Sequence, residues 1–294
     1  MNRLRISMPP DPNPRRPKFK APPKSCDTHC HIFGPPDLFP YAATRPYTPP
    51  AAPLEHYLSV LDILGIERGI IVQPNAHATD NTVTLDAIAR GNGRFRGICR
   101  LVGDESDAEL KRLRDGGIRA ARFNFGVSLG HKINIPVFER SVARFGELGW
   151  FADVHVDPEG LATYADVFRA SPVPIVIDSL AQFDAGQGLG QRGFKLLLEL
   201  LAEPKFWVKI AGINWLSARG APYADVVPFA RAALEAAPDR VIWGTNWPHS
   251  HRFEHGTAPN DGDLVDIIPL YAPEPELQRK HLVDNPGRLF KFDS

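Results

Sequence analysis

The sequence predicts one large α/β domain with the architecture of a (β/α)8 TIM barrel. Eight short apolar runs recur along the chain, and stretches with helical periodicity separate them. Parallel strands that are buried on both faces appear in a sequence as such apolar runs. The length of 294 residues suits one barrel of this kind. A doubly wound open sheet is the structural alternative, but no Gly-x-Gly-x-x-Gly motif follows the first run.

The expected strands alternate with expected helices over almost the whole chain. The eight strands are predicted at 26–33, 68–75, 96–102, 118–125, 150–157, 173–180, 206–213 and 240–247. Amphipathic stretches at 54–65, 107–117 and 223–237 predict helices between them. The glycine pair at 116–117 is typical of a helix end that leads into the next strand. Residues 25–294 are therefore expected to form the barrel.

The first 24 residues are rich in proline and arginine and predict an extended N-terminal arm. This arm is expected either as a strap over the barrel floor or as a tail without regular structure. It has no apolar segment, so we expect no secretory signal there.

The charge balance argues against nucleic acid and membranes as partners. Lysines plus arginines number 34, and aspartates plus glutamates also number 34, so no net field attracts a polyanion. No apolar run approaches the roughly 20 residues that span a bilayer. Three cysteines, Cys26, Cys30 and Cys99, are typical of a reducing compartment and are expected to pack in the core. We therefore expect a cytoplasmic protein.

Polar side chains gather where the barrel would place an active site. Active sites of these barrels lie at the carboxyl ends of the strands. His29 and His31 stand two residues apart at the end of the first run, so both imidazoles point to the same face. The ends of the other runs supply further candidates, namely Asn75, His77, Arg122, His155, Ser179, Arg219, Asn246 and His249. This convergence predicts a small-molecule site.

Several phrases resemble the amidohydrolase superfamily. They are "DTHCHIFGP" at 27–35, "RFNF" at 122–125, "VPIVID" at 173–178 and "RVIWGTNWPH" at 240–249. Within the superfamily they are similar to the branch of 2-pyrone-4,6-dicarboxylate lactonase and D-galactarolactone isomerase. The phrases at 79–90 and 282–292 extend the resemblance over nearly the whole chain. It implies a distorted barrel and a hydrolase of small lactones.

The resemblance also raises the question of whether this chain binds a metal ion. Most amidohydrolases hold a divalent ion with the His-x-His pair, further histidines on strands five and six, and an aspartate on strand eight. His29, His31 and His155 match that pattern, but Ser179 and Asn246 replace the sixth-strand histidine and the aspartate. An asparagine amide is a weak zinc ligand and no base. We therefore expect no metal cofactor, with one Zn²⁺ on His29, His31 and His155 as the alternative.

The expected site follows from this mapping. His29 and His31 would polarise a carbonyl, His155 would be the general base, and Asn246 would orient water. We expect Arg122 to bind a substrate carboxylate, and Arg219, His131 or Lys132 to bind a second one. The resemblance implies that Tyr47 contacts the substrate. The remaining substrate-binding candidates are Asn75, His77, Ser179 and His249.

These expectations lead to a metal-independent hydrolase of a small carboxylated lactone in aromatic or sugar-acid catabolism, as a monomer or homodimer. Three alternatives stay open. Asn246 favours an aldarolactone isomerase, in which a substrate hydroxyl replaces water. The three histidines would also suit a zinc-dependent hydrolase or decarboxylase. The replaced site residues would suit an inactive barrel that binds a small acid.

Overall fold

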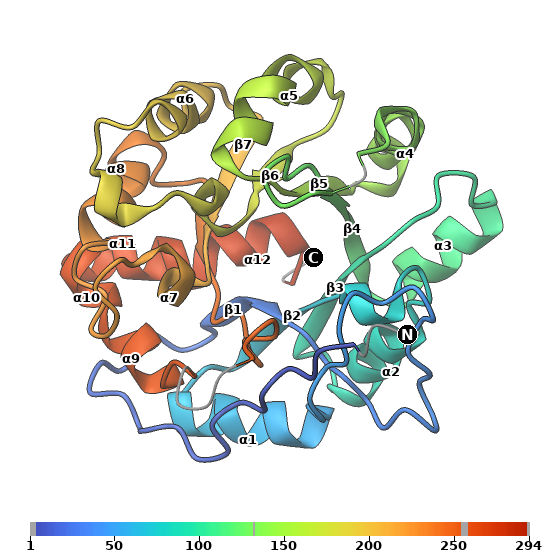
Figure 1. Ribbon diagram of the computed structural model, residues 1–294, viewed down its shortest axis with the longest axis horizontal. Helices are drawn as coiled ribbons and strands as arrows, with labels where there is room; N and C mark the ends of the chain where they lie inside the picture. The colour runs from blue at the N-terminus through green and yellow to red at the C-terminus, as the bar shows by residue number, and fades with distance from the viewer. Residues whose placement is uncertain (1–3, 132, 254–257, 293–294) are drawn as a thin grey trace.

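The computed structural model describes residues 4–131, 133–253 and 258–292 as a ring of eight parallel strands surrounded by helices (Figure 1). The strands follow one another around the sheet in chain order. They are β1 Cys26–Cys30, β2 Arg68–Val72, β3 Phe95–Cys99, β4 Ile118–Asn124, β5 Phe151–His155, β6 Ile175–Ile177, β7 Phe206–Ile210 and β8 Val241–Trp243. The ring closes where the backbone N–H of His31 donates to the carbonyl of Trp247 over 2.8 Å. The barrel prediction is confirmed.

The helices lie outside the ring and in the loops. They are α1 Leu54–Leu64, α2 Thr82–Arg90, α3 Asp107–Asp115, α4 Ile135–Leu148, α5 Pro158–Ala170, α6 Arg192–Leu201, α7 Ile213–Leu216, α8 Val227–Ala236, α9 Asp261–Asp266, α10 Ile268–Tyr271, α11 Pro275–Arg279 and α12 Asn285–Phe290. Short 3₁₀ turns occupy Asn75–His77, Asp178–Gln182 and Ala185–Gln187, and Lys280–Asp284 forms a π-helical turn. The predicted helix at 223–237 begins only at Val227, with Pro228 in its first turn.

The lower barrel interior is apolar. Its inward layer consists of Cys26, Ile70, Val72, Ile98, Ala120, Phe151, Val176, Trp207 and Ile242, and Phe290 of α12 packs against it. Helix α12 lies across the middle of the ring in Figure 1 and so closes the floor. Because side chains alternate along a strand, the residues two places later point into the same interior nearer the mouth. That second layer is where the polar residues lie.

The N-terminal arm lies beside the mouth, whereas the expectation was a strap over the floor or a tail without regular structure. The backbone N–H of Ser7 donates to Thr48 in the loop after β1, and that of Met8 donates to Arg252 in the loop after β8. Arg15 then forms ion pairs with Asp263 and Asp266 of α9. Because loops after strands lie at the carboxyl ends, these contacts hold the arm near the mouth. Within the described ranges, no helix is both long and apolar enough to cross a bilayer.

Candidate active site

A buried layer of alternating charges lies directly above the apolar floor. Lys209 Nζ lies 2.6 Å from Asp153 Oδ2 and 3.3 Å from Asp178 Oδ1. Arg122 Nη1 forms ion pairs with the same two carboxylates, at 3.3 Å to Asp153 and 2.8 Å to Asp178. Two cations thus neutralise two anions. The neighbouring His29, together with the cations Lys209 and Arg122, holds the pKa of Asp178 well below its ordinary value, although burial alone would raise it.

His29 connects this layer to His31. His29 Nδ1 lies 3.0 Å from Asp178 Oδ1 and 3.5 Å from Lys209 Nζ. Its Nε2 lies 3.3 Å from Nε2 of His31, with the two rings perpendicular at 90°. His31 Nδ1 lies 2.7 Å from the Val72 carbonyl, which only accepts, so Nδ1 of His31 carries a proton. A neutral His31 therefore presents a lone pair at Nε2.

Burial lowers the pKa of His29, and it lowers the pKa of His31 well below the ordinary value. The neighbouring His29 lowers the pKa of His31 further, because two imidazolium charges would repel each other. At neutral pH both rings are then neutral, and the contact between the two Nε2 atoms needs one proton. Two groups compete to set the tautomer of His29: the Asp178 carboxylate at 3.0 Å favours a proton on Nδ1, and the Lys209 ammonium at 3.5 Å favours the proton on Nε2. With the proton on His29 Nε2, the pair offers one donor and one acceptor side by side.

A second polar layer continues around the mouth, from the loop after β2 to the turn after β6. Arg100 follows β3 and donates to Asn75 Oδ1, which follows β2. Asn124 Nδ2, at the end of β4, lies 3.5 Å from the same oxygen. Asn124 is the register partner of His155 on β5, and Nε2 of His155 contacts the amide nitrogen of Gln182 after β6. His131 lies beside His155, with ring centroids 5.3 Å apart. Lys132 lies outside the described residues.

The structure brings only some of the predicted site residues together. His29, His31, Arg122 and His155 lie in the two layers just described. Asn246 and Ser179 both border Gly212, whose missing side chain leaves room for them at 3.5 and 3.8 Å from an ideal Cβ position. Both residues have positive φ angles, 68° for Asn246 and 50° for Ser179. They therefore sit on sharply turned backbone at the mouth.

Four other candidates lie apart from this group. Tyr47 is 2% exposed, packs on His251 with centroids 4.1 Å apart, and has a pKa that burial raises to about 12. His77 is buried beside Phe33 and Tyr41 and donates from Nδ1 to the Pro40 carbonyl. His249 is fully buried and its Nε2 lies 2.8 Å from Asp261 Oδ1. Arg219 is exposed on the loop after α7.

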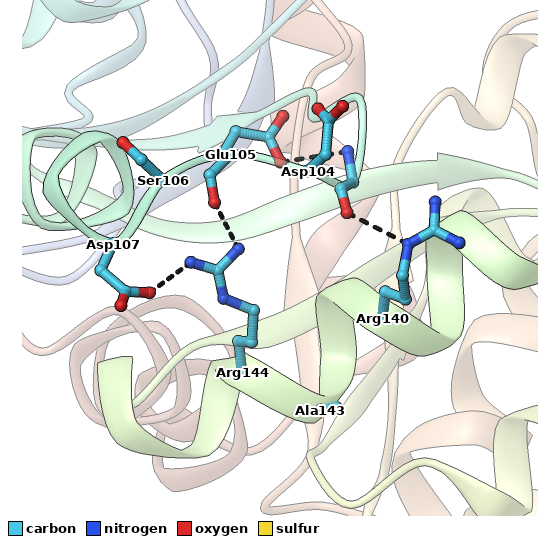
Figure 2. A pocket seen from close by; sticks show the side chains of 8 residues that line it. Asp104, Glu105, Ser106, Asp107, Arg140, Ala143 and Arg144 are labelled. Atoms are coloured by element: carbon cyan, nitrogen blue, oxygen red, sulfur yellow. Dashed lines mark hydrogen bonds and ion pairs between the residues drawn. The ribbon is translucent and has the colours of Figure 1, made fainter.

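A large surface hollow does not coincide with these polar layers. It has a volume of 730 Å³ and lies between the loop before α3 and one face of α4. Figure 2 shows Arg140 and Arg144 of α4 reaching toward this segment, where Arg140 contacts the Gly103 carbonyl and Asp107 begins α3. Arg144 is engaged by the Glu105 carbonyl and the Asp107 carboxylate. The hollow contains none of the histidines of the barrel mouth.

Sequence reasoning missed four members of the two layers, namely Arg100, Asp153, Gln182 and Lys209. A signal existed for Asp153 and Lys209, because each is a charged residue inside a predicted buried strand, in "FADVH" and "FWVKI". Charged residues are almost never buried unless they are paired. Gln182 and Arg100 lie in loops just past their strands, where a polar residue is unremarkable without the structure.

Comparison with known proteins decides the family. The model of the family described as amidohydrolase matches residues 26–292. This chain belongs to the amidohydrolase family. A 4-sulfomuconolactone hydrolase of Rhizobium radiobacter is 42% identical over 92% of this amidohydrolase and 91% of its own length. A 2-pyrone-4,6-dicarbaxylate hydrolase of Comamonas testosteroni is 39% identical over 95% and 93%, and a D-galactarolactone isomerase of Agrobacterium fabrum is 30% identical over 96% and 94%.

Solved structures agree with the sequence relatives. The crystal structure of a putative 2-pyrone-4,6-dicarboxylic acid hydrolase from Pseudomonas putida has a TM-score of 0.78 and 32% identity, covering 92% of this amidohydrolase and 98% of that chain. The resemblance on which the family expectation rested is thereby confirmed.

The metal that many amidohydrolases hold does not fit the residues of this one as they are arranged. His29 and His31 converge at Nε2, but His155 turns its own Nε2 to Gln182. Over the described parts of the chain, no three histidine, cysteine, aspartate or glutamate side chains converge as metal ligands. Asn246 lies three residues after the end of β8, and its amide supplies no anionic ligand.

Proposed function

We propose that this amidohydrolase hydrolyses a small lactone that carries an anionic group, without a metal ion. The observation that carries the proposal is the contact between Nε2 of His29 and Nε2 of His31. With the His29 proton on Nε2, this contact sets one hydrogen-bond donor beside one acceptor. Hydrolysis of a lactone needs both, because the carbonyl oxygen gains negative charge while the attacking water loses a proton. Relatives named as lactone hydrolases support the same class of substrate.

In the proposed reaction the lactone carbonyl oxygen accepts a hydrogen bond from His29 Nε2. Water attacks the carbonyl carbon and gives its proton to Nε2 of His31, whose Nδ1–H is held by the Val72 carbonyl. The tetrahedral intermediate then breaks the bond to the ring oxygen, which takes the proton from His31. The products are a hydroxyl or enol group and a carboxylic acid, which releases one proton at neutral pH. Asp178 and Lys209 hold His29 in place.

This proposal moves the role of general base from His155 to His31. The Gln182 amide occupies Nε2 of His155, and Nδ1 of His155 is buried without a partner among the described residues. Asn246 lies half-buried at the mouth and its amide is able to orient water. The same amide is the observation that favours the second candidate, a lactone isomerase, because an asparagine takes no proton from water.

The test combines metal analysis with proton release. Protein purified without chelator or histidine tag is analysed for metal by plasma mass spectrometry. It is then assayed in a pH-stat with 4-sulfomuconolactone, 2-pyrone-4,6-dicarboxylate and D-galactarolactone. We expect one proton per turnover on a lactone and far less than one metal ion per chain. Stoichiometric zinc would overturn the metal-free proposal. Conversion without proton release would assign the isomerase, and no conversion would leave an acid-binding barrel.

A further inference from the structure

Arg100 is held rigidly at the mouth by its neighbours. It comes two residues after Ile98, which points into the barrel interior, so its side chain emerges on the inner face. Its backbone is fixed on both sides by Asn81, which accepts from Arg100 N at 2.9 Å and donates to Arg100 O at 3.0 Å. Arg100 Nη1 donates to Asn75 Oδ1. Asn75 therefore positions the guanidinium, and Asn81 positions the backbone that carries it.

The charge of Arg100 has no counter-ion in the described parts of the chain. Its side-chain partner Asn75 is neutral, no carboxylate lies within ion-pair distance, and its Nε is buried without a hydrogen-bond partner. Burial, and after it the charge of a second cation, Arg122, lowers the pKa of Arg100 to about 10. A half-buried cation without an anion is costly, and proteins rarely keep one unless a ligand supplies the anion.

Arg122 differs from Arg100 because it has counter-ions. Arg122 was expected to bind the substrate carboxylate, but Asp153 and Asp178 already neutralise it within the barrel. Arg219, the other expected anchor, is exposed on a loop. Of these three arginines, Arg100 alone combines partial burial, a fixed position at the mouth and an uncompensated charge.

We propose that Arg100 binds the anionic substituent of the substrate, a carboxylate or a sulfonate. This inference rests on the proposed function, because it names the group that the lactone must carry. The Val72 carbonyl at the end of β2 holds His31, and Asn75 after β2 holds Arg100. The anion bound by Arg100 would therefore lie one strand away from the lactone carbonyl that His29 and His31 contact. A planar oxyanion matches the donor fork of a guanidinium. Arg100 then determines specificity and takes no part in bond making.

The binding test uses two ring acids that contain no lactone, isophthalate and 3-sulfobenzoate, in calorimetric titrations. Wild-type protein is expected to bind one of them, and the tighter probe tells a carboxylate from a sulfonate. Arg100→Met is expected to weaken that binding roughly 10- to 100-fold, and Arg100→Lys about tenfold, because lysine keeps the charge but loses the fork. Arg140→Met is the matched control, since Arg140 is an exposed arginine at the hollow of Figure 2, and it should bind as wild type.

Asn75→Asp provides a second variant that does not depend on removing Arg100. The new carboxylate would pair with Arg100 and neutralise it from within. We expect the melting temperature to rise while probe affinity falls about tenfold or more. A gain in stability with lower affinity is not what general damage to the site produces. Unchanged affinity in Arg100→Met and Asn75→Asp, or no binding of either probe by wild type, would overturn the inference.

Kinetics separate this inference from the proposed function. On an anionic lactone, Arg100→Met should raise KM and leave kcat within a few-fold, whereas an uncharged lactone such as 2-pyrone should show the same KM in both proteins. If no lactone is turned over but Arg100→Met still loses probe binding, the proposed function fails and the anion site stands. If lactones are turned over and Arg100→Met leaves KM unchanged, the function stands and the anion site fails.

Discussion

His29 and His31 approach each other through Nε2 at 3.3 Å, and each ring is held from its other nitrogen by a different group. The Val72 carbonyl fixes the proton of His31 on Nδ1, while Asp178 and Lys209 compete for Nδ1 of His29. The Val72 contact makes Nε2 of His31 a hydrogen-bond acceptor. The contacts with Asp178 and Lys209 determine how readily His29 takes up a proton. The direction of the hydrogen bond between the two rings is therefore set from outside the pair.

This direction makes His31 the group whose protonation should limit activity in acid. Burial and His29 hold the pKa of His31 well below 6.5, so it remains a free base down to below pH 6.5. We expect kcat/KM for lactone hydrolysis to stay level from pH 8 to 6.5 and to fall only at lower pH. His31→Gln should lower kcat about 10²- to 10⁴-fold. His56→Gln is the control, since His56 lies in α1 and packs on Trp247 with ring centroids 5.5 Å apart. An acid limb centred above pH 6.5 would contradict the assignment.

The buried ion pairs predict a large cost for removing Lys209. Lys209→Met leaves Asp153 with only the longer contact to Arg122, so a buried carboxylate loses its main partner. We expect the free energy of unfolding to fall by about 3–5 kcal/mol in urea titrations. The double variant Lys209→Met with Asp153→Asn removes both charges and should recover part of that loss. A double variant that is less stable than the single one would show that the pair is not what matters.

His281 predicts a pH dependence of stability that is independent of catalysis. It is buried between the Val241 carbonyl and Tyr271, and burial lowers its pKa from 6.5 to about 4. A lowered histidine pKa means that its full contribution is present above pH 6.5 and is lost as pH falls toward 4. At pH 5 the loss is about 2 kcal/mol. His281→Gln should therefore narrow the difference in unfolding free energy between pH 7 and 5 by about that amount, and an unchanged difference would disprove it.

Two aspartates of α9 provide a matched comparison of buried and exposed pairs. Asp261 and His249 are both fully buried and 2.8 Å apart, whereas Asp263 pairs with the exposed Arg15. Asp261→Ala leaves His249 Nε2 without its partner and should cost about 2–3 kcal/mol of unfolding free energy. Asp263→Ala should cost less than about 1 kcal/mol. Equal losses would mean that the His249–Asp261 contact contributes no more than a surface pair.

Much of the site was predictable, because the alternation of side chains along a strand and the barrel architecture are both evident in the sequence. His-x-His at a strand end places two imidazoles on one face, and the barrel places strand ends together, so His29, His31, Arg122 and His155 could be grouped from the sequence. Tyr47, His77 and His249 follow strands in the same way but are buried against their own loops. Whether a loop side chain turns into the mouth depends on the path of that loop, which no periodicity describes.

By itself, the sequence determined the barrel, its strand order and the pair of histidines, because alternation along a strand and burial on both faces leave a direct pattern in the chain. Only the tertiary structure decided which arginine has carboxylate counter-ions and which has none among the described residues. Arg122 meets Asp153 and Asp178 across strands, while Arg100 meets Asn75 and a second cation. Compensation of charge is a matter of distance in space, and the closing of the barrel sets those distances.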